Sequence, residues 1–282
     1  MYRIVRKKAL NPTVTQMEIE APLVARKAKP GQFIILRVDE AGERIPLTVA
    51  GTNPEEGTVK IIFQIVGATT ELLNHKQEGE SIQDFVGPLG VATHTEGIKK
   101  VCIVGGGVGC AIAMPVAQEF HRLGAEVTSI IGFRSKDLLI LEDEFRACSD
   151  KLIVMTDDGS YARHGNVTVP LKELLEAGET FDAIITIGPL IMMKFVTLTA
   201  KPYGVPVTAS MNPIMIDGTG MCGGCRLTLN QDGKRVTKFA CVDGPDFNAY
   251  EIDFDEAMSR GRMYFGYERR AHEEVCNLFK NA

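Results

Sequence analysis

The 282-residue sequence predicts an α+β multidomain protein in which a β-barrel is followed by an α/β domain with a parallel sheet and a small C-terminal segment. Residues 1–96 contain short alternating runs of polar and apolar residues broken by Gly and Pro, which is typical of a small barrel. In residues 97–206 apolar strand-like runs alternate with helical stretches, which is typical of a parallel sheet covered by helices. Residues 207–250 are Gly-rich and carry three cysteines, and residues 251–282 are expected to be helical.

The composition argues against a nucleic-acid-binding, membrane-spanning or disulfide-rich protein. The net charge is −5 and no long run of Lys and Arg occurs, which argues against nucleic acid or an anionic membrane as the main partner. No apolar stretch approaches the roughly 20 residues that a membrane span needs. The seven cysteines are odd in number and form no regular disulfide framework, which favours a reducing compartment. We therefore expect a soluble cytoplasmic protein.

The barrel region carries two features that suit a dinucleotide. Its expected strands include residues 33–38, 58–66 and 81–86. Thr69 and Thr70 offer an N-cap for a short helix that ends before Gly79, and a helix N-terminus with free backbone N–H groups favours a phosphate. Upstream, residues 44–48 read Arg-Ile-Pro-Leu-Thr, which in isolation would be a surface turn. An Arg, an extended strand and such a helix start in one barrel suit FAD.

A glycine-rich loop opens the α/β region. Residues 101–104 are an apolar strand, residues 105–109 read Gly-Gly-Gly-Val-Gly, and residues 111–123 are helical, which is the context of a nucleotide-binding loop. The strict Gly-x-Gly-x-x-Gly pattern fails, because Cys110 stands at the third glycine position. Glycines that only let the helix pack closely on the strand are therefore an alternative. Further strands are expected at residues 127–132, 152–155 and 183–187.

Three loops follow these strands, at residues 132–137, 156–160 and 188–193. Open α/β sheets bind ligands at the carboxyl ends of their strands, so these loops are expected to line a nucleotide crevice. Arg134, Ser135 and Lys136 could receive a 2′-phosphate, but a solvated loop would have the same composition. Charge alone therefore does not distinguish NAD from NADP.

The cysteine-bearing segment predicts a redox centre. Asp217, Cys222, Cys225 and Cys241 reproduce the spacing of a plant-type [2Fe-2S] site if Asp217 is a ligand in the first position. A zinc site is the alternative, since Cys-x2-Cys also occurs in zinc ribbons. Structural zinc usually requires a second cysteine pair or added His, and residues 206–250 contain no His. The spacing therefore favours an iron–sulfur cluster.

These motifs occur in the order found in the ferredoxin-reductase-like flavoproteins, and the chain resembles that family over nearly its whole length. The resemblance implies a β-barrel FAD domain, an NAD-binding α/β domain and a small C-terminal [2Fe-2S] domain, and it favours NAD over NADP. The FAD-binding residues that it implies are Arg44, Pro46, Leu47, Thr48, Phe63, Gln64, Ile65, Gly67, Thr69 and Thr70. The residues implied for NAD(H) are Gly106, Gly107, Val108, Gly109, Cys110, Arg134, Ser135, Asp157, Asp158, Gly188 and Met192. Cys110 would lie near the nicotinamide, with buried packing as its alternative role.

Asp217 and the later run Cys-Val-Asp-Gly-Pro of residues 241–245 narrow the resemblance. They are similar to the small subunits of NADH-dependent reduced ferredoxin:NADP⁺ oxidoreductase and of sulfide dehydrogenase. The electron-transfer subunits of dihydroorotate dehydrogenase share the same organisation but carry four Cys ligands.

The resemblance implies an oxidoreductase subunit that passes electrons between NAD(H), FAD and the cluster. Its partner would be a larger flavoprotein and iron–sulfur subunit in a heterodimer, performing electron bifurcation with NADP(H) and, indirectly, ferredoxin. FAD would convert between the hydride of nicotinamide and the single electrons of the cluster. The alternatives are a subunit of a sulfide dehydrogenase or dihydroorotate dehydrogenase complex, and a non-enzymatic zinc-binding interaction module.

Overall fold

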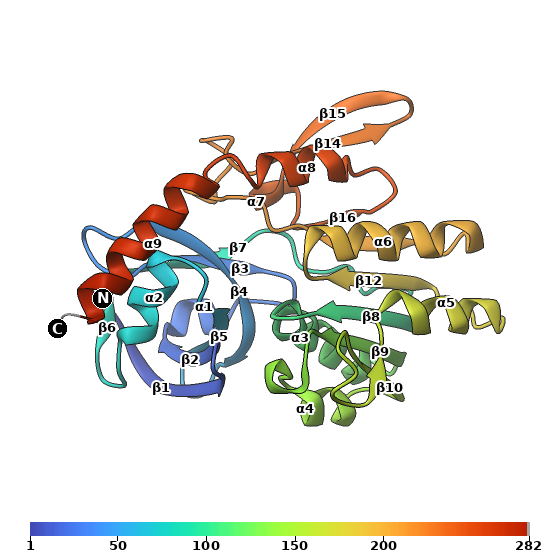
Figure 1. Ribbon diagram of the computed structural model, residues 1–282, viewed down its shortest axis with the longest axis horizontal. Coiled ribbons are helices and arrows are strands. Elements are labelled where there is room, and N and C mark those ends of the chain that lie inside the picture. Colours follow the sequence, from blue (N-terminus) through green and yellow to red (C-terminus); the bar gives the residue numbers. More distant parts are fainter. Residues whose placement is uncertain (281–282) are drawn as a thin grey trace.

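The computed structural model describes residues 1–280, with side chains described to residue 275. These residues form two seven-stranded sheets and a two-stranded hairpin. In Figure 1 the barrel (blue) and the α/β sheet (green to yellow) lie side by side, and the C-terminal elements (orange to red) run across both. The expected fold class, an α+β protein with a barrel followed by an α/β sheet, is confirmed.

The first sheet is antiparallel and curls into an open barrel with the strand order β6-β1-β2-β5-β4-β3-β7. Its strands are β1 (Tyr2–Asn11), β2 (Val14–Glu20), β3 (Phe33–Arg37), β4 (Arg44–Asn53), β5 (Thr58–Gln64), β6 (Ser81–Ile82) and β7 (Asp84–Leu89). Its helices are α1 (Pro22–Ala25) and α2 (Ala68–His75). Alternate residues such as Ile34 and Leu36 of β3 point into the barrel core, whereas Phe33 and Ile35 pack outside it.

The second sheet has the order β11-β10-β9-β8-β12-β13-β16 and is parallel except for β16. Its strands are β8 (Lys100–Gly106), β9 (Glu126–Phe133), β10 (Lys151–Thr156), β11 (Arg163–His164), β12 (Ala183–Ile187), β13 (Val207–Ser210) and β16 (Asp246–Asn248). Its helices are α3 (Gly109–Arg122), α4 (Glu142–Ala147), α5 (Thr168–Glu176) and α6 (Leu190–Ala200), with 3-10 turns at Lys136–Leu138 and Lys201–Tyr203.

Helices cover both faces of the parallel sheet, which explains why β8 is apolar throughout. Val101 and Ile103 pack with α3 and α4 on one face, whereas Cys102 and Val104 pack with α5 and α6 on the other. A strand buried on both faces needs apolar residues at every position rather than at alternate ones. Figure 1 shows the two helix layers on opposite sides of the sheet.

The C-terminal segment leaves the parallel sheet after β13 and returns to it at β16. Between them lie a loop, the hairpin β14 (Arg226–Gln231) and β15 (Lys234–Phe239), and α7 (Ala240–Asp243). The sheet is followed by α8 (Phe254–Arg260) and by α9 (Phe265–Lys280), which packs on α2 of the barrel. The expected C-terminal helical segment thus contains two helices.

The start of α2 differs from the prediction. Its N-cap is the extended Gly67, so neither Thr69 nor Thr70 is the N-cap residue. Thr70 Oγ1 accepts the N–H groups of Val66 and Gly67, each at 3.0 Å. Thr70 stands three residues after the N-cap and thus completes a capping box from inside the helix.

The expected strand at residues 81–86 is also divided, since β6 ends at Ile82 and β7 begins at Asp84. The two strands lie at opposite edges of the barrel sheet, so the chain turns between them. Among the described residues, no helix is both long and apolar enough to cross a membrane.

Phe120 provides a test of the α3 packing. It is fully buried between α3 and the sheet, so Phe120→Ala should lower the free energy of unfolding by about 3–5 kcal/mol. Leu123, at the end of the same helix, is 50% exposed, and Leu123→Ala should change it by less than about 1 kcal/mol. Urea denaturation monitored by circular dichroism measures both, and equal losses would contradict this placement of α3.

Candidate functional site

The barrel motif forms one wall of a cavity of about 320 Å³. Of the residues predicted to bind FAD, those that line it are Pro46, Leu47, Thr48, Phe63, Gln64 and Thr70. The opposite wall comes from the α/β sheet and includes Val108, Ile112 and Ser210. Arg44, Ile65, Gly67 and Thr69 lie outside this lining, with Arg44 exposed at the start of β4. The cavity therefore joins the barrel to the nucleotide loop.

The sequence did not indicate the third contributor to this cavity. Met211, Asn212, Met215 and Pro245, all from the segment that carries the cysteines, also line it. The only sequence signal was Pro245 at the end of the run that begins with Cys241. The barrel motif, the nucleotide loop and the cysteine segment thus meet at one place.

The glycine-rich loop packs closely against its neighbours at two of its glycines and leaves free space beside a third. A Cβ added at Gly109 would lie 2.5 Å from Ile187 O, and one at Gly106 would lie 2.2 Å from Met192 Sδ. These two glycines therefore let the turn after β12 approach α3 and β8. Gly107 has φ +56° and nothing within 4 Å of an added Cβ, so its backbone faces open space.

Two further cavities, of about 490 and 440 Å³, meet at this loop. Gly106, Gly107 and Arg134 line both. The larger also takes in Val108, Gly109 and Gly188, and the smaller takes in Asp157 and Met192. The chain crosses from one side of β8 to the other between β10 and β12, and such a switch point is where α/β sheets bind ligands.

Three of the predicted nucleotide residues lie outside these cavities, namely Cys110, Ser135 and Asp158. Asp158 Oδ1 accepts hydrogen bonds from Ser160 N at 2.9 Å and Ser160 Oγ at 2.6 Å, which lower its pKa. Asp158 thus shapes the loop. Ile191 of the predicted loop at residues 188–193 lines the smaller cavity, and three residues that the prediction missed, Asn166, Thr168 and Phe195, line it as well. The sequence did offer one signal, because an Asn just before a helical stretch is typical of a helix start. In the structure Asn166 stands two residues before α5, and its side chain accepts a hydrogen bond from Thr168 N at 3.0 Å.

Cys110 is fully buried beneath the loop and lines none of these cavities. Burial raises the pKa of its thiol far above the ordinary value. The side chain lies in the core formed by α3 and its sheet, as its alternative packing role requires.

Asp217 organises the cysteine loop. Its Oδ1 accepts Thr219 N at 2.5 Å and Thr219 Oγ1 at 2.9 Å, and its Oδ2 accepts Cys222 N at 2.8 Å. The backbone N–H of Thr219 is the largest influence that lowers the pKa of Asp217 to about 2. The side chain is therefore a carboxylate at neutral pH and lies directly beside Cys222.

Cys225 and Cys241 form a second pair. Cys225 Sγ lies 3.1 Å from Cys241 Sγ, and both side chains are buried, whereas Cys222 is exposed. Burial first and then the neighbouring Cys225 raise the pKa of Cys241 to about 12. Two thiolates so close together in a buried site would repel each other. A positively charged metal centre would compensate their charge and allow both thiols to lose their protons.

The four donors thus form two pairs, Asp217 with Cys222 and Cys225 with Cys241. Among the described side chains, no three His, Cys, Asp or Glu residues gather closely enough to hold a single metal ion. A structural zinc site needs its ligands around one ion, whereas a two-iron cluster takes two protein ligands on each iron. The arrangement fits a [2Fe-2S] cluster better than zinc.

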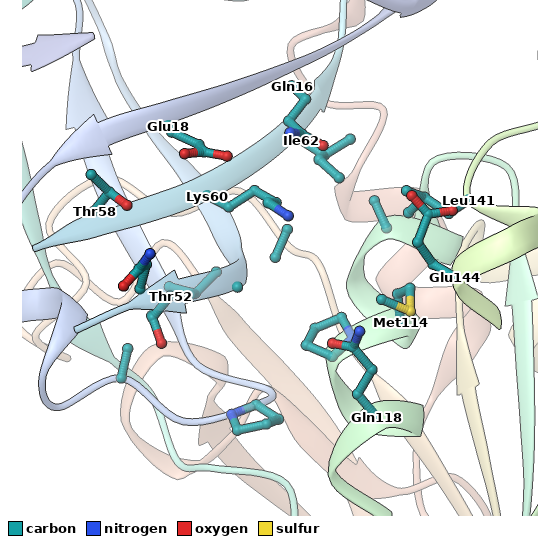
Figure 2. A pocket seen from close by; sticks show the side chains of 18 of the residues that line it. Gln16, Glu18, Thr52, Thr58, Lys60, Ile62, Met114, Gln118, Leu141 and Glu144 are labelled. Atoms are coloured by element: carbon teal, nitrogen blue, oxygen red, sulfur yellow. The ribbon is translucent and has the colours of Figure 1, made fainter. Parts of the chain in front are cut away.

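A larger cavity, about 650 Å³, lies elsewhere. Figure 2 shows it between the outer face of the barrel, where Lys60 and Glu18 lie, and the helical side with Gln118 and Glu144. None of the residues predicted for the cofactors lines it. Cavity size therefore does not locate the functional site in this protein.

Comparisons with known proteins agree with this geometry. Residues 212–253 match the iron–sulfur cluster binding domain of dihydroorotate dehydrogenase B. The chain is 46% identical over 273 residues to the dihydroorotate dehydrogenase B (NAD(+)) electron transfer subunit homolog of Thermotoga maritima, covering 97% of this chain and 95% of that protein.

A solved structure of NADH-dependent reduced ferredoxin-NADP oxidoreductase, described in terms of flavin-based electron bifurcation, is 44% identical with a TM-score of 0.90 and 98% of each chain covered. The ferredoxin reductase of carbazole 1,9a-dioxygenase, at 19% identity and a TM-score of 0.61 over 73% of this chain and 65% of that chain, shares the fold alone.

These similarities confirm the resemblance seen in the sequence. At the level of the family they also confirm an oxidoreductase with FAD, an iron–sulfur cluster and NAD(H) as cofactors. A barrel, a nucleotide crevice and a cysteine segment meet around one cavity, as an electron-transfer chain requires. The chain belongs to the family of the dihydroorotate dehydrogenase B electron transfer subunits.

Proposed function

We propose that this chain transfers electrons between NAD(H) and a larger flavoprotein and iron–sulfur subunit, through FAD and a [2Fe-2S] cluster. The observation that carries the proposal is the shared cavity, whose walls come from Thr48 of the barrel, Val108 of the nucleotide loop and Met215 of the cysteine segment. A flavin in this cavity would lie beside both the nicotinamide crevice and the cluster. Bound FAD supplies the conversion between two-electron and one-electron transfer.

FAD would be held by the barrel. Pro46, Leu47 and Thr48 on β4 present an extended strand along the cavity, and Phe63 and Gln64 on β5 continue that wall. The α2 N-terminus would receive the pyrophosphate, because its first N–H groups point out of the helix and the dipole favours an anion. Arg44, Ile65, Gly67 and Thr69 would contact the parts of FAD that extend beyond the cavity.

NAD(H) would bind across the crevice at the glycine-rich loop. The free space where Gly107 lacks a side chain would let the pyrophosphate approach the loop closely, and Arg134 would neutralise it. Asp157 lines the same cavity as Arg134, and a carboxylate there would accept a ribose hydroxyl and repel a 2′-phosphate. Apolar Ile191 and Phe195, about half exposed on α6, would cover the adenine. This combination favours NAD over NADP.

The cluster would be held by Asp217 and Cys222 on one iron and by Cys225 and Cys241 on the other. The exposed Cys222 and its neighbour Met221, 89% exposed, would place one side of the cluster at the surface. Single electrons would pass there to or from the larger subunit. Oxygen ligation by Asp217 would alter the potential relative to a thiolate ligand.

For the whole complex we propose electron bifurcation with NADP(H) and, indirectly, ferredoxin. The support is the similarity along the full chain to the NADH-dependent reduced ferredoxin-NADP oxidoreductase structure, together with Asp217 in place of a fourth cysteine. A dihydroorotate dehydrogenase complex is the second candidate, supported by the match of residues 212–253. A sulfide dehydrogenase complex would use the same subunit architecture.

A visible absorption spectrum with iron, sulfide and zinc analysis tests the cofactors. We expect one FAD and two irons for each chain, with flavin bands and the broader absorption of a [2Fe-2S] cluster. A colourless protein containing zinc would overturn the proposal. NADH-dependent reduction of an artificial acceptor, and then of the substrates of each candidate large subunit, distinguishes the three complexes.

Asp217→Cys tests the fourth ligand. A thiolate in place of the carboxylate should keep the cluster but shift its reduction potential, because ligand charge donation changes. Potentiometric titration followed by electron paramagnetic resonance measures the shift. The control is Asp232→Asn, which removes a carboxylate at the hairpin turn of the same segment. The backbone of Asp232 has a positive φ, which Asn tolerates, so this variant should leave the reduction potential of the cluster unchanged. An unchanged spectrum and potential in Asp217→Cys would exclude Asp217 as a ligand.

Gly109→Ala tests the nucleotide loop. The new Cβ would lie 2.5 Å from Ile187 O and 2.7 Å from Gly188 Cα, so the turn after β12 must move away. We expect NADH to bind about tenfold more weakly, equivalent to about 1.4 kcal/mol, with the FAD content unchanged. Fluorescence titration with NADH measures this. Gly266→Ala, where an added Cβ meets nothing within 4 Å, is the control, and equal affinities in both variants would contradict the assignment.

A further inference from the structure

Asp246 occupies a junction between the three parts of the molecule. It begins β16 and pairs with Ser210 at the end of β13, where Met211 N donates to Pro245 O at 2.9 Å. Ser210, Met211 and Pro245 all line the proposed flavin cavity. Asp246 therefore lies one residue from the cavity wall, on the chain that comes from Cys241.

Only one of the two carboxyl oxygens of Asp246 has a hydrogen-bond partner among the described residues. Its Oδ2 accepts a hydrogen bond from Thr93 Oγ1 at 2.7 Å. Its Oδ1 is buried and has no hydrogen-bond partner among the described residues. A carboxylate with one buried, unpartnered oxygen is costly, which favours the neutral carboxylic acid. Burial accordingly raises the pKa of Asp246, and the hydroxyls of Thr93 and then Ser210 offset part of that effect.

Two hydroxyl groups flank this carboxyl in opposite directions. Ser210 lies on the cavity side. Thr93 belongs to the connection between the barrel and the parallel sheet, where Thr93 N donates to Pro30 O at 3.0 Å and His94 is exposed. Asp243 of α7, three residues before Asp246, is also exposed. The row Ser210, Asp246 and Thr93 thus leads from the cavity toward the surface at His94.

Thr93 is held in place by a close backbone approach. A Cβ added at Gly31, where φ is +88°, would lie 2.3 Å from Thr93 Oγ1. Only glycine therefore lets the barrel turn reach the hydroxyl that contacts Asp246. Val91 N also donates to Gly244 O at 2.6 Å, which fixes the connection against β16.

The proposed electron path creates a proton imbalance at the cavity. A hydride from NADH carries two electrons and one proton to the flavin, whereas a [2Fe-2S] cluster accepts only electrons, one at a time. After both electrons have left for the cluster, one proton has to leave the cavity. The reverse direction requires one proton to enter.

We propose that Asp246 is the proton relay of the flavin cavity. Oδ1 accepts a proton from the Ser210 side, Oδ2 gives its proton to Thr93 Oγ1, and Thr93 turns its hydroxyl and releases its own proton toward the exposed His94. The inference rests on the proposed function, since it assigns a role beside the bound flavin. A neutral carboxylic acid performs this step without a net change, because one O–H bond forms as the other breaks. No oxidant or reductant beyond the flavin and the cluster is needed.

Asp246→Asn is the first test, because the amide has the same shape but does not relay protons. In H₂O-minus-D₂O infrared difference spectra of the loaded protein, we expect the carbonyl band of a protonated carboxylic acid. The band should be missing in Asp246→Asn and retained in Glu96→Gln, which removes an exposed carboxylate from the same connection as Thr93. A band that persists in Asp246→Asn, or its absence from the unaltered protein, would overturn the proposal.

Ser210→Ala is the second test and leaves the Thr93 contact intact. Both Asp246→Asn and Ser210→Ala should slow reoxidation of the reduced flavin by a one-electron acceptor about tenfold or more and remove its solvent isotope effect. Unchanged rates in both would contradict the relay. Measuring the FAD and iron content separates the proposed function from the proton relay. A protein without these cofactors refutes the proposed function. A loaded protein with unchanged rates refutes only the relay.

Discussion

The pairing of β16 with β13 is the interaction on which the arrangement of the site depends. The chain leaves the parallel sheet at Ser210, carries Asp217, Cys222 and Cys225 through a loop, and returns antiparallel at Asp246. This return ties the cysteine segment to the sheet beside Ser210, which lines the cavity shared with the barrel. Backbone hydrogen bonds at the edge of the sheet thus hold the cysteine segment next to that cavity.

A second constraint is the close approach of backbones around the cavity. Gly106 and Gly109 let the turn after β12 reach β8 and α3, and an added Cβ at Gly218 would lie 2.8 Å from Ile35 of the barrel. The outer face of β3, with Phe33 and Ile35, packs in the same apolar cluster as Met215, Cys225 and Cys241. Glycines therefore bring the nucleotide loop and the cysteine loop close enough to share a wall with the barrel, and apolar burial holds them there.

Much of the fold and part of the site could be predicted, for identifiable reasons. Burial on both faces makes β8 apolar throughout, and alternation marks the barrel strands, so periodicity identified the two sheets. The lining residues Thr48, Gly107 and Arg134 lie in motifs whose spacing follows from local backbone geometry. Asn166, Phe195 and Ser210 were not predicted, because a polar or aromatic residue near the end of a strand or helix has no pattern of its own. Their roles arise from neighbours far away in the sequence.

The sequence by itself indicated the fold class and the family and predicted the donors of a cluster, because these depend on residue type and local spacing. The sequence did not decide whether Asp217 is the fourth ligand, or whether Cys110 lies near the nicotinamide or packs in the core. Only the tertiary structure paired Asp217 with Cys222 and Cys225 with Cys241, buried Cys110, and set Asp246 between Ser210 and Thr93. Burial and partner distance are properties of contacts across more than a hundred residues, such as that of Thr93 with Asp246. Local pattern therefore identifies the donors, and long-range packing decides which of them act together.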